Sequence, residues 1–441
     1  MNARLSGLAI GVRRGALLAL LIALLGACAA IRDRDGVPSE PVILVSLDAF
    51  RPVDLGRGLT PTLDRLRAEG ASAASMQPSF PTLTFPNHYT LVTGLRPDRN
   101  GVIHNTMTDP ELSGERFATS NRAAVQDARW WAQAEPIWTR VQRSGQRAAT
   151  MYWPGSEAPV HGAYPDDWAA FDPEVTPEQR VDTVLGWLDR PAGRRPAFMS
   201  LYFEHVDKAA HHDGPDSPEA AAAVRRVDAA LARLVAGIAA RGLDDRVNLV
   251  IVSDHGMATV APGQVTYLED LIDEADADIV TTGVLAGLRP QPGRTATVER
   301  ALLGRHAHME CWRKRALPVR FRYGTHRRVP PLLCLADEGW VVSTRARMAA
   351  MAHVSRGEHG YDPALPSMQA IFIARGPAFV PGAQVPPIDN VDVYPLLAHL
   401  LGVTPGPHEG SLQPLRPLLK PPTRPAARRS PVAPAQPLPL R

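Results

Sequence analysis

The stretch VILVSLDAF, residues 42–50, begins with a mostly apolar run that is followed directly by Asp48. Similar runs occur at FMSLYF (198–203) and NLVIVS (248–253). Runs of this kind are typical of strands buried on both faces in a parallel sheet. Amphipathic segments alternate with them, such as TPTLDRLRAEG (60–70) and SPEAAAAVRRVDAALARLVAGIAARG (217–242). This alternation predicts an α/β fold, with a mostly parallel central sheet and helices on both faces.

The composition is that of a globular protein large enough to bury its own core. The chain has 441 residues, of which 45% are hydrophobic and 21% are charged. Its formal net charge of +3 is small for this length, so the sequence argues against a nucleic-acid scaffold as partner. No internal repeat is evident, and no obligate protein partner is predicted.

The N-terminus has the features of an export signal. Arg13 and Arg14 precede an apolar run from Ala16 to Leu25, which is too short to span a bilayer as a helix. The run ends in Leu25-Gly26-Ala27-Cys28, which resembles the lipobox of bacterial lipoproteins. That resemblance implies cleavage before Cys28, a lipid on its sulfur and a position on the periplasmic side of a bacterial membrane. The alternative is an ordinary signal peptide in which Cys28 has no role.

The other two cysteines are Cys311 and Cys334. In an exported chain an even pair of cysteines predicts a disulfide, and two buried free thiols are the alternative. Such a bond would stabilise the fold by roughly 3 kcal/mol in the chain-entropy model.

Four segments follow from these features. Residues 1–27 form the predicted signal peptide and residues 28–40 a tether. Residues 41–403 form the folded domain. Residues 404–441 are rich in proline and poor in acidic and aromatic residues, so we expect a disordered tail there.

An acidic residue stands at or soon after the end of each buried strand: Asp48, Asp207 and Asp254. The carboxyl ends of strands in an open α/β sheet are where ligands bind, so these carboxylates could meet in one crevice. Histidines accompany them at His211, His255 and His359. This density of carboxylate and imidazole suits two zinc sites, each with three protein ligands and an open position. Taken singly, an aspartate after a strand is more often a turn or cap residue.

The string PTLTFPNHYTLVTG, residues 81–94, predicts a helix that starts near Thr84. Thr84 has two interpretations. Its hydroxyl could cap the helix by accepting a hydrogen bond from a first-turn amide. It could instead be a nucleophile at the end of the helix where an anion is best held.

Longer strings resemble the nucleotide pyrophosphatase/phosphodiesterases, a branch of the alkaline phosphatase superfamily. The similarity begins with LVSLDAFRPVDL and SFPTLTFPNHYTLVTGLRPDRNGVIHNTM. It continues through YFEHVDKAAHHDG, VSDHGM and GEHGYDPALPSMQAIFIARGP to near Val403, and so covers most of the folded domain.

The resemblance implies roles for particular residues. One zinc would be held by Asp207, His211 and His359, and a second by Asp48, Asp254 and His255. Thr84 would be the nucleophile, with its oxygen also bound by the second zinc, and Asn105 would hold a phosphoryl oxygen. Ala210 stands where the family usually has glycine, which changes no ligand. We also expect the backbone amide of Phe85 to face the developing negative charge.

Family members that act on nucleotides stack the base between aromatic side chains. Phe85 is placed to form one wall, and the segment HGAYPDDWAAFD offers Tyr164, Trp168 and Phe171 for the other. Ordinary core or surface packing is the alternative for each of these residues.

The resemblance therefore implies a lipid-anchored, two-zinc phosphodiesterase that converts nucleotides to nucleoside monophosphates through a phosphothreonine. A lipid-headgroup (choline-type) phosphodiesterase and a phosphomonoesterase of the same superfamily are the nearest alternatives. A surface lipoprotein that binds zinc without catalysis belongs to another class, and the presence of all six candidate ligands argues against it.

Overall fold

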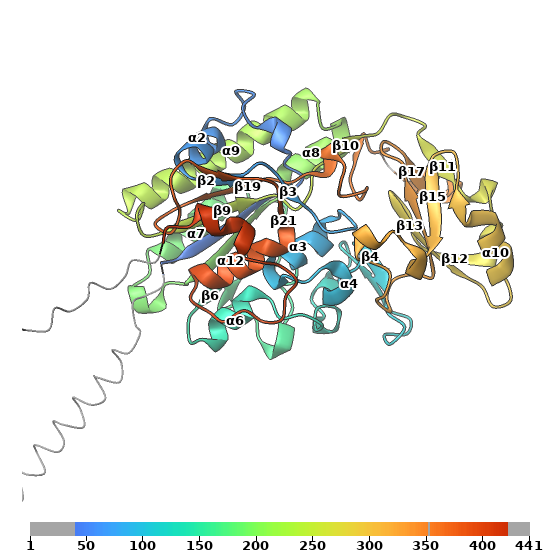
Figure 1. Cartoon of the computed structure of the whole chain (residues 1–441), viewed down its shortest axis with the longest axis horizontal. Helices are drawn as coiled ribbons and strands as arrows, with labels where there is room; N and C mark the ends of the chain where they lie inside the picture. The colour runs from blue at the N-terminus through green and yellow to red at the C-terminus, as the bar shows by residue number, and fades with distance from the viewer. Residues whose placement is uncertain (1–39, 352, 422–441) are drawn as a thin grey trace, which may run out of the picture. The chain divides into compact units, whose positions relative to one another are not determined.

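The computed structural model describes residues 40–351 and 353–421, coloured in Figure 1. Within them lies an eight-stranded sheet in the order β20-β2-β19-β9-β1-β8-β6-β7. Strands β7, β6, β8, β1 and β9 pair in parallel, whereas β19 is antiparallel to β9 and β2. In sheet order the strands are Ala383–Val385, Ala71–Ala73, Phe372–Arg375, Asn248–Val252, Val42–Leu47, Phe198–Phe203, Ala148–Met151 and Asp167–Trp168. The predicted mostly parallel sheet is confirmed.

Strand β1 lies between β8 and β9 at the centre of this sheet. All six of its side chains are buried. Val42 and Leu44 belong to one hydrophobic cluster, whereas Ile43 and Val45 belong to another. Because side chains alternate along a strand, the two clusters are the cores on the two faces of the sheet.

Helices cover both faces, as the alternating sequence predicts (Figure 1). The cluster around Ile43 includes side chains from α2 (Pro61–Glu69), α7 (Pro177–Leu188) and α9 (Pro218–Ala240). The cluster around Val42 includes side chains from α3 (Thr84–Thr93), α6 (Ile137–Arg143) and α12 (Val393–Leu400).

A second, five-stranded sheet has no counterpart in the sequence-based expectation. All its strand pairs are antiparallel, in the order β12-β13-β16-β15-β14. These strands are Ala277–Thr281, Leu285–Pro290, Leu332–Ala336, Met309–Arg313 and Gly304–Arg305. The sheet lies between β9 and β19 in the sequence, and Figure 1 shows it in yellow and orange.

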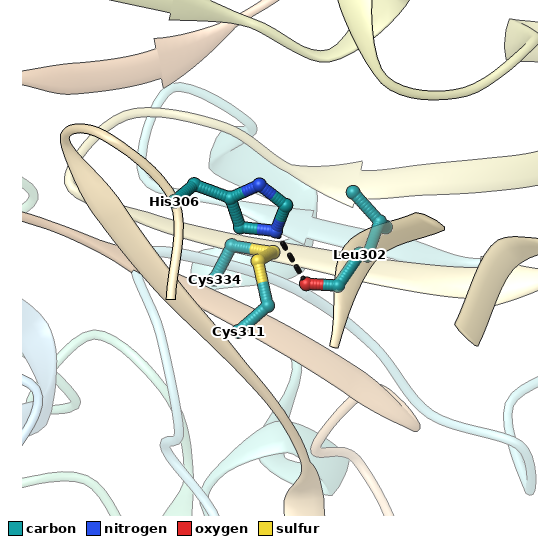
Figure 2. The surroundings of a disulfide bond; sticks show 4 residues. All are labelled: Leu302, His306, Cys311 and Cys334. Carbon is teal, nitrogen blue, oxygen red and sulfur yellow. Dashed lines mark hydrogen bonds between the residues drawn. A yellow bond between two sulfur atoms is a disulfide. The ribbon is translucent and has the colours of Figure 1, made fainter. Parts of the chain in front are cut away.

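The predicted disulfide is present in this second sheet. Cys311 on β15 and Cys334 on β16 are directly opposite each other, and their sulfur atoms are bonded (Figure 2). Both residues are buried, and the neighbouring His306 ring contacts the Leu302 carbonyl through Nε2 at 2.7 Å. The bond therefore joins two adjacent strands inside the hydrophobic core.

The boundary predicted at Thr404 is wrong, because the chain remains folded to Pro421. Leu415 and Leu418, in the short helix η11 (Gln413–Leu418), are both fully buried. Glu409 accepts a hydrogen bond from the Arg96 amide at 2.7 Å through Oε2. The proline content suggested disorder, yet two leucines three residues apart suffice to dock this segment on the core.

The predicted signal peptide, Cys28 and nearly all of the tether lie outside the described residues, as does the tail beyond Pro421. Among the helices of residues 40–351 and 353–421, none has both the length and the apolar character needed to cross a membrane.

Candidate active site

Three neighbouring parallel strands bring the predicted carboxylates to one edge of the main sheet. Asp48 directly follows β1, and Asp254 lies two residues beyond the end of β9. Asp207 lies in α8 (His205–Asp213), which begins two residues after β8. His211 is one helical turn further along α8, so it shares a face with Asp207. The sequence-based argument from strand ends therefore places these groups correctly.

The three histidines present the same nitrogen to the carboxylates. Their Nδ1 atoms lie 2.7–2.8 Å from backbone carbonyl oxygens, of Gly357 for His211, Gly256 for His255 and Thr82 for His359. A carbonyl oxygen only accepts, so Nδ1 carries the proton and a neutral ring leaves Nε2 with a free lone pair. Histidines that bind a metal through Nε2 usually donate a hydrogen bond from Nδ1 in this way.

These Nε2 atoms face carboxylate oxygens at short range. His211 and His359 approach Asp207 Oδ1 at 3.4 and 3.6 Å. His255 approaches Asp254 Oδ2 at 3.0 Å and Asp48 Oδ1 at 3.5 Å. Lone pairs that face each other at these distances repel, so each pair needs a proton or a metal ion between nitrogen and oxygen.

The carboxylates themselves also indicate a cation. Asp48 Oδ1, Asp207 Oδ1 and Asp254 Oδ2 are buried and have no hydrogen-bond partner within the described chain. Burial and the like charges of Asp254 and Asp207 raise the pKa of Asp48 well above its usual range. Burial, followed by the charge of His255, lowers the pKa of His359 to about 3, which keeps that ring neutral. The other two rings respond in the opposite sense: against the effect of burial, the charge of Asp207 raises the pKa of His211 to about 10, and that of Asp254 raises the pKa of His255. The carboxylates thus draw positive charge to this site, and carboxylate and imidazole together fit a divalent metal such as zinc.

Grouping potential ligand atoms within 4.8 Å of one another gives three sets among the described residues. One set is Asp207, His211 and His359, which is the first predicted zinc site. The others are Asp48, Asp207 and His255, and Asp48, His88 and Asp254. Asp48, Asp254 and His255, predicted for the second zinc, are thus in one place but are divided between two overlapping sets.

Thr84 is the first residue of α3, and the residue in the N-cap position is Leu83. The capping interpretation of Thr84 is therefore wrong. Its hydroxyl oxygen instead lies 3.3 Å from His255 Nε2, beside the carboxylate cluster. A hydroxyl at the positive end of a ten-residue helix, next to potential metal ligands, is well placed to attack an anionic phosphate.

We expected the Phe85 amide to be available to a phosphate group, but its N–H already has a partner within the protein. It donates a hydrogen bond to Asn105 Oδ1 at 2.9 Å. This contact fixes the Asn105 side chain and leaves its Nδ2 group as the donor for a substrate. The helix start is thus joined to Asn105 by this hydrogen bond.

A cavity of about 1290 Å³ opens over this cluster, with Thr84, Asn105, Asp207 and His359 in its lining. It shares Phe85, Phe171 and Tyr202 with an adjoining pocket of about 270 Å³. The pocket is largely apolar, and Tyr152, Trp153 and Pro154 complete its apolar wall.

Only one of the three aromatic candidates for the second wall lies beside this cavity. Phe171 lines both hollows together with Phe85. Tyr164 and Trp168 line neither, and instead stack on each other with ring centroids 4.7 Å apart. Both are exposed, at 39% and 37%. For Tyr164 and Trp168, the alternative of ordinary surface packing is therefore the correct one.

Two residues of this site were missed from the sequence. Tyr202, near the end of β8, donates a hydrogen bond to Asp48 Oδ2 at 2.5 Å. His88, one turn after Thr84 on α3, is fully buried next to Asp254. His88 could have been predicted, because residues four apart in a helix lie on the same face and His88 follows Thr84 by four. Nothing in the sequence distinguishes Tyr202 from other residues of a buried strand.

The chain matches the family model described as type I phosphodiesterase / nucleotide pyrophosphatase over residues 42–362. It is 34% identical over 388 residues to an uncharacterised pyrophosphatase/phosphodiesterase of Schizosaccharomyces pombe, covering 86% of this chain and 80% of that one. It is 33% identical to bis(5'-adenosyl)-triphosphatase enpp4 of Xenopus laevis, covering 86% of this chain and 82% of that one.

Mouse ectonucleotide pyrophosphatase/phosphodiesterase family member 1 is 34% identical over 87% of this chain, which spans only 43% of that longer protein. Among solved structures, an inactive form of murine ectonucleotide pyrophosphatase/phosphodiesterase 5 in complex with AMP matches with a TM-score of 0.81. The two are 32% identical, and the match covers 86% of this chain and all of that one.

Proposed function

The chain belongs to the type I phosphodiesterase / nucleotide pyrophosphatase family, and from this we propose that it hydrolyses nucleotide phosphodiester and pyrophosphate bonds to nucleoside monophosphates. One observation carries the proposal. Buried carboxylate oxygens that have no hydrogen-bond partner lie next to histidine Nε2 atoms, and one of these nitrogens, that of His255, contacts the Thr84 hydroxyl. The names of the relatives, and the AMP in one related structure, support nucleotides as the substrate class.

Two zinc ions complete the proposed site. Asp207, His211 and His359 would hold one ion, and Asp48, Asp254 and His255 the other. Zinc bound there supplies the positive charge that lowers the pKa of a nearby hydroxyl and stabilises negative charge on a phosphoryl group.

Thr84 is the proposed nucleophile. Its Oγ1 loses its proton and forms a bond to phosphorus while the ester or anhydride bond breaks and the leaving group departs on the opposite side, which gives a covalent phosphothreonine that still carries the nucleoside. The proton lost by the hydroxyl balances the charge on the leaving oxygen. Water then attacks the same phosphorus, breaks the bond to Thr84 and releases the nucleoside monophosphate. The Asn105 amide donates to a phosphoryl oxygen throughout, because its Oδ1 is held by the Phe85 amide.

Phe85 and Phe171 are proposed to hold the nucleotide base. Both face the cavity and the adjoining apolar pocket, and stacking on aromatic rings tolerates any base. A neutral donor at Asn105 and an apolar pocket favour a singly charged diester over a doubly charged monoester.

The experiment compares kcat/KM for the nitrophenyl ester of thymidine 5'-phosphate with that for nitrophenyl phosphate. We expect the nucleotide ester to be favoured by at least about a hundredfold, or about 2.7 kcal/mol of transition-state binding. Equal or reversed values would make the protein a phosphomonoesterase. Preference for nitrophenyl phosphocholine would make it a lipid-headgroup diesterase.

We also propose that the mature protein begins at Cys28, carries a lipid on that cysteine and acts on the periplasmic side of a bacterial membrane. The lipobox-like Leu25-Gly26-Ala27-Cys28 supports this. A Cys28→Ser variant should leave the membrane fraction or remain unprocessed. If the variant is still processed and membrane-bound, Cys28 is not the anchor.

A further inference from the structure

His88 lies on α3 with both ring nitrogens engaged. Nδ1 is 2.8 Å from the backbone carbonyl oxygen of Thr84, and Nε2 is 2.8 Å from the hydroxyl oxygen of Ser46 on β1. Because the carbonyl can only accept, Nδ1 carries the proton. With its proton on Nδ1, the ring accepts at Nε2 a hydrogen bond from the Ser46 hydroxyl. His88 therefore links α3, which carries Thr84, to the central strand β1.

The same Nδ1 lies 3.3 Å from Asp254 Oδ2, one of the buried carboxylate oxygens without a hydrogen-bond partner. The other oxygen of that carboxylate accepts from the Ala49 amide at 3.2 Å. The N–H bond is thus directed at the Thr84 carbonyl, and the same nitrogen lies beside a carboxylate of the proposed metal site without a hydrogen bond to it.

The ring has little freedom to move. It is fully buried and packs edge-on against Trp153 and Tyr202, with ring centroids 5.0 Å away in each case. Trp153 donates from Nε1 to the backbone carbonyl of His88 at 3.1 Å, and Tyr202 donates to Asp48. The surroundings therefore hold the Nδ1–H group in one direction.

We propose that His88 is a positioning residue, which holds the Thr84 carbonyl by a hydrogen bond from Nδ1 and sets Asp254 beside it through the close contact of that same nitrogen. The proposal rests on the proposed function of Thr84 and Asp254. His88 is not itself a metal ligand, because its two nitrogens already bind Thr84 and Ser46. Its role differs from that of His211, His255 and His359, whose Nε2 atoms face carboxylate oxygens; that of His255 also lies 3.3 Å from the Thr84 hydroxyl.

Two substitutions separate this role from packing alone. In His88→Asn the side-chain amide can place an N–H group where Nδ1 lies, whereas in His88→Gln the longer side chain reaches toward the Nε2 position instead. Both remove the ring from between Trp153 and Tyr202, so both should lower the melting temperature by similar amounts. Zinc affinity, measured by competition with a chromophoric chelator, should distinguish them.

We expect His88→Gln to weaken zinc binding by about 10- to 100-fold, the usual effect of losing a residue that orients a metal ligand. Its kcat at saturating zinc should fall by about tenfold, with KM for the nucleotide ester little changed. His88→Asn should lose at least about fivefold less zinc affinity than His88→Gln.

Equal losses of zinc affinity in the two variants, or no loss in either, would overturn the proposal. Loss of zinc binding in both, with kcat restored in neither by excess zinc, would make His88 a ligand. A wild-type protein that binds zinc but hydrolyses no diester would refute the proposed function, while the difference in zinc affinity between the variants would still decide the role of His88.

Discussion

Phe171 lines the cavity beside Phe85, whereas Trp168, three residues earlier, stacks on Tyr164 at the surface. If Phe171 contacts the base, Phe171→Ala should raise KM for the nucleotide ester by roughly fivefold, because an aromatic contact contributes about 1 kcal/mol. The value for nitrophenyl phosphate, which carries no base, should stay the same. Steady-state kinetics on both substrates measures this effect.

Trp168→Ala is the matched control, since it removes an aromatic side chain from the same segment but away from the cavity. It should leave both KM values close to those of the wild type. A rise in KM for Trp168→Ala with none for Phe171→Ala would reverse the assignment.

For single residues, the sequence predicts the candidate ligands that follow strand ends. It does not predict the residues that hydrogen-bond to those ligands. Asp48 and Asp254 follow strands, and His255 and His359 stand beside glycines, so their positions in the chain reveal them. Tyr202 is hidden inside an apolar strand, and its contact with Asp48 joins residues 154 apart in the sequence. The bond between the Phe85 amide and Asn105 was also invisible, because it depends on how a loop folds back onto α3.

The C-terminal element η11 docks on the core through Leu415 and Leu418, both fully buried. Truncating a buried leucine removes apolar contact and leaves a cavity. Leu418→Ala should therefore lower the free energy of unfolding by about 2–5 kcal/mol. Denaturant titration monitored by tryptophan fluorescence gives this value.

Arg416→Ala, in the same element but exposed, is the control and should change stability by less than about 0.5 kcal/mol. If Leu418→Ala were as stable as this control, the burial of Leu418 would contribute nothing to the stability of the fold.

Elements differ in how well the sequence predicts them. Strands β1, β8 and β9 and helices α2 and α9 have clear apolar periodicity and lie within a residue or two of their predicted ends. Thr60 directly precedes α2, yet its side chain makes no capping hydrogen bond. The second sheet was missed, because most of its strands, such as β15 with the sequence MECWR, lack the continuous apolar runs of β1, β8 and β9.

Across the whole molecule, the buried carboxylates should make stability depend on bound metal. Asp48, Asp207 and Asp254 repel one another unless a cation neutralises them, and a ligand that binds only the folded state stabilises it. Chelation should therefore abolish activity and lower the melting temperature together, and added zinc should restore both. Activity assays and thermal unfolding on the same samples test this.

Magnesium should restore neither property, because it prefers oxygen ligands and three of the proposed ligands are imidazoles. Full recovery with magnesium alone would contradict the proposed zinc sites. An unchanged melting temperature after complete removal of metal would contradict the idea that the carboxylates need a cation.

The central claim is that Thr84 forms the bond to phosphorus in a site whose metals are held by other residues. The most direct test is to measure zinc content and nucleotide-ester hydrolysis of Thr84→Ala side by side with the wild type. The claim predicts an unchanged zinc content and a loss of kcat of about a thousandfold or more. A variant that keeps its zinc and still hydrolyses the ester at more than a few per cent of the wild-type rate would contradict it.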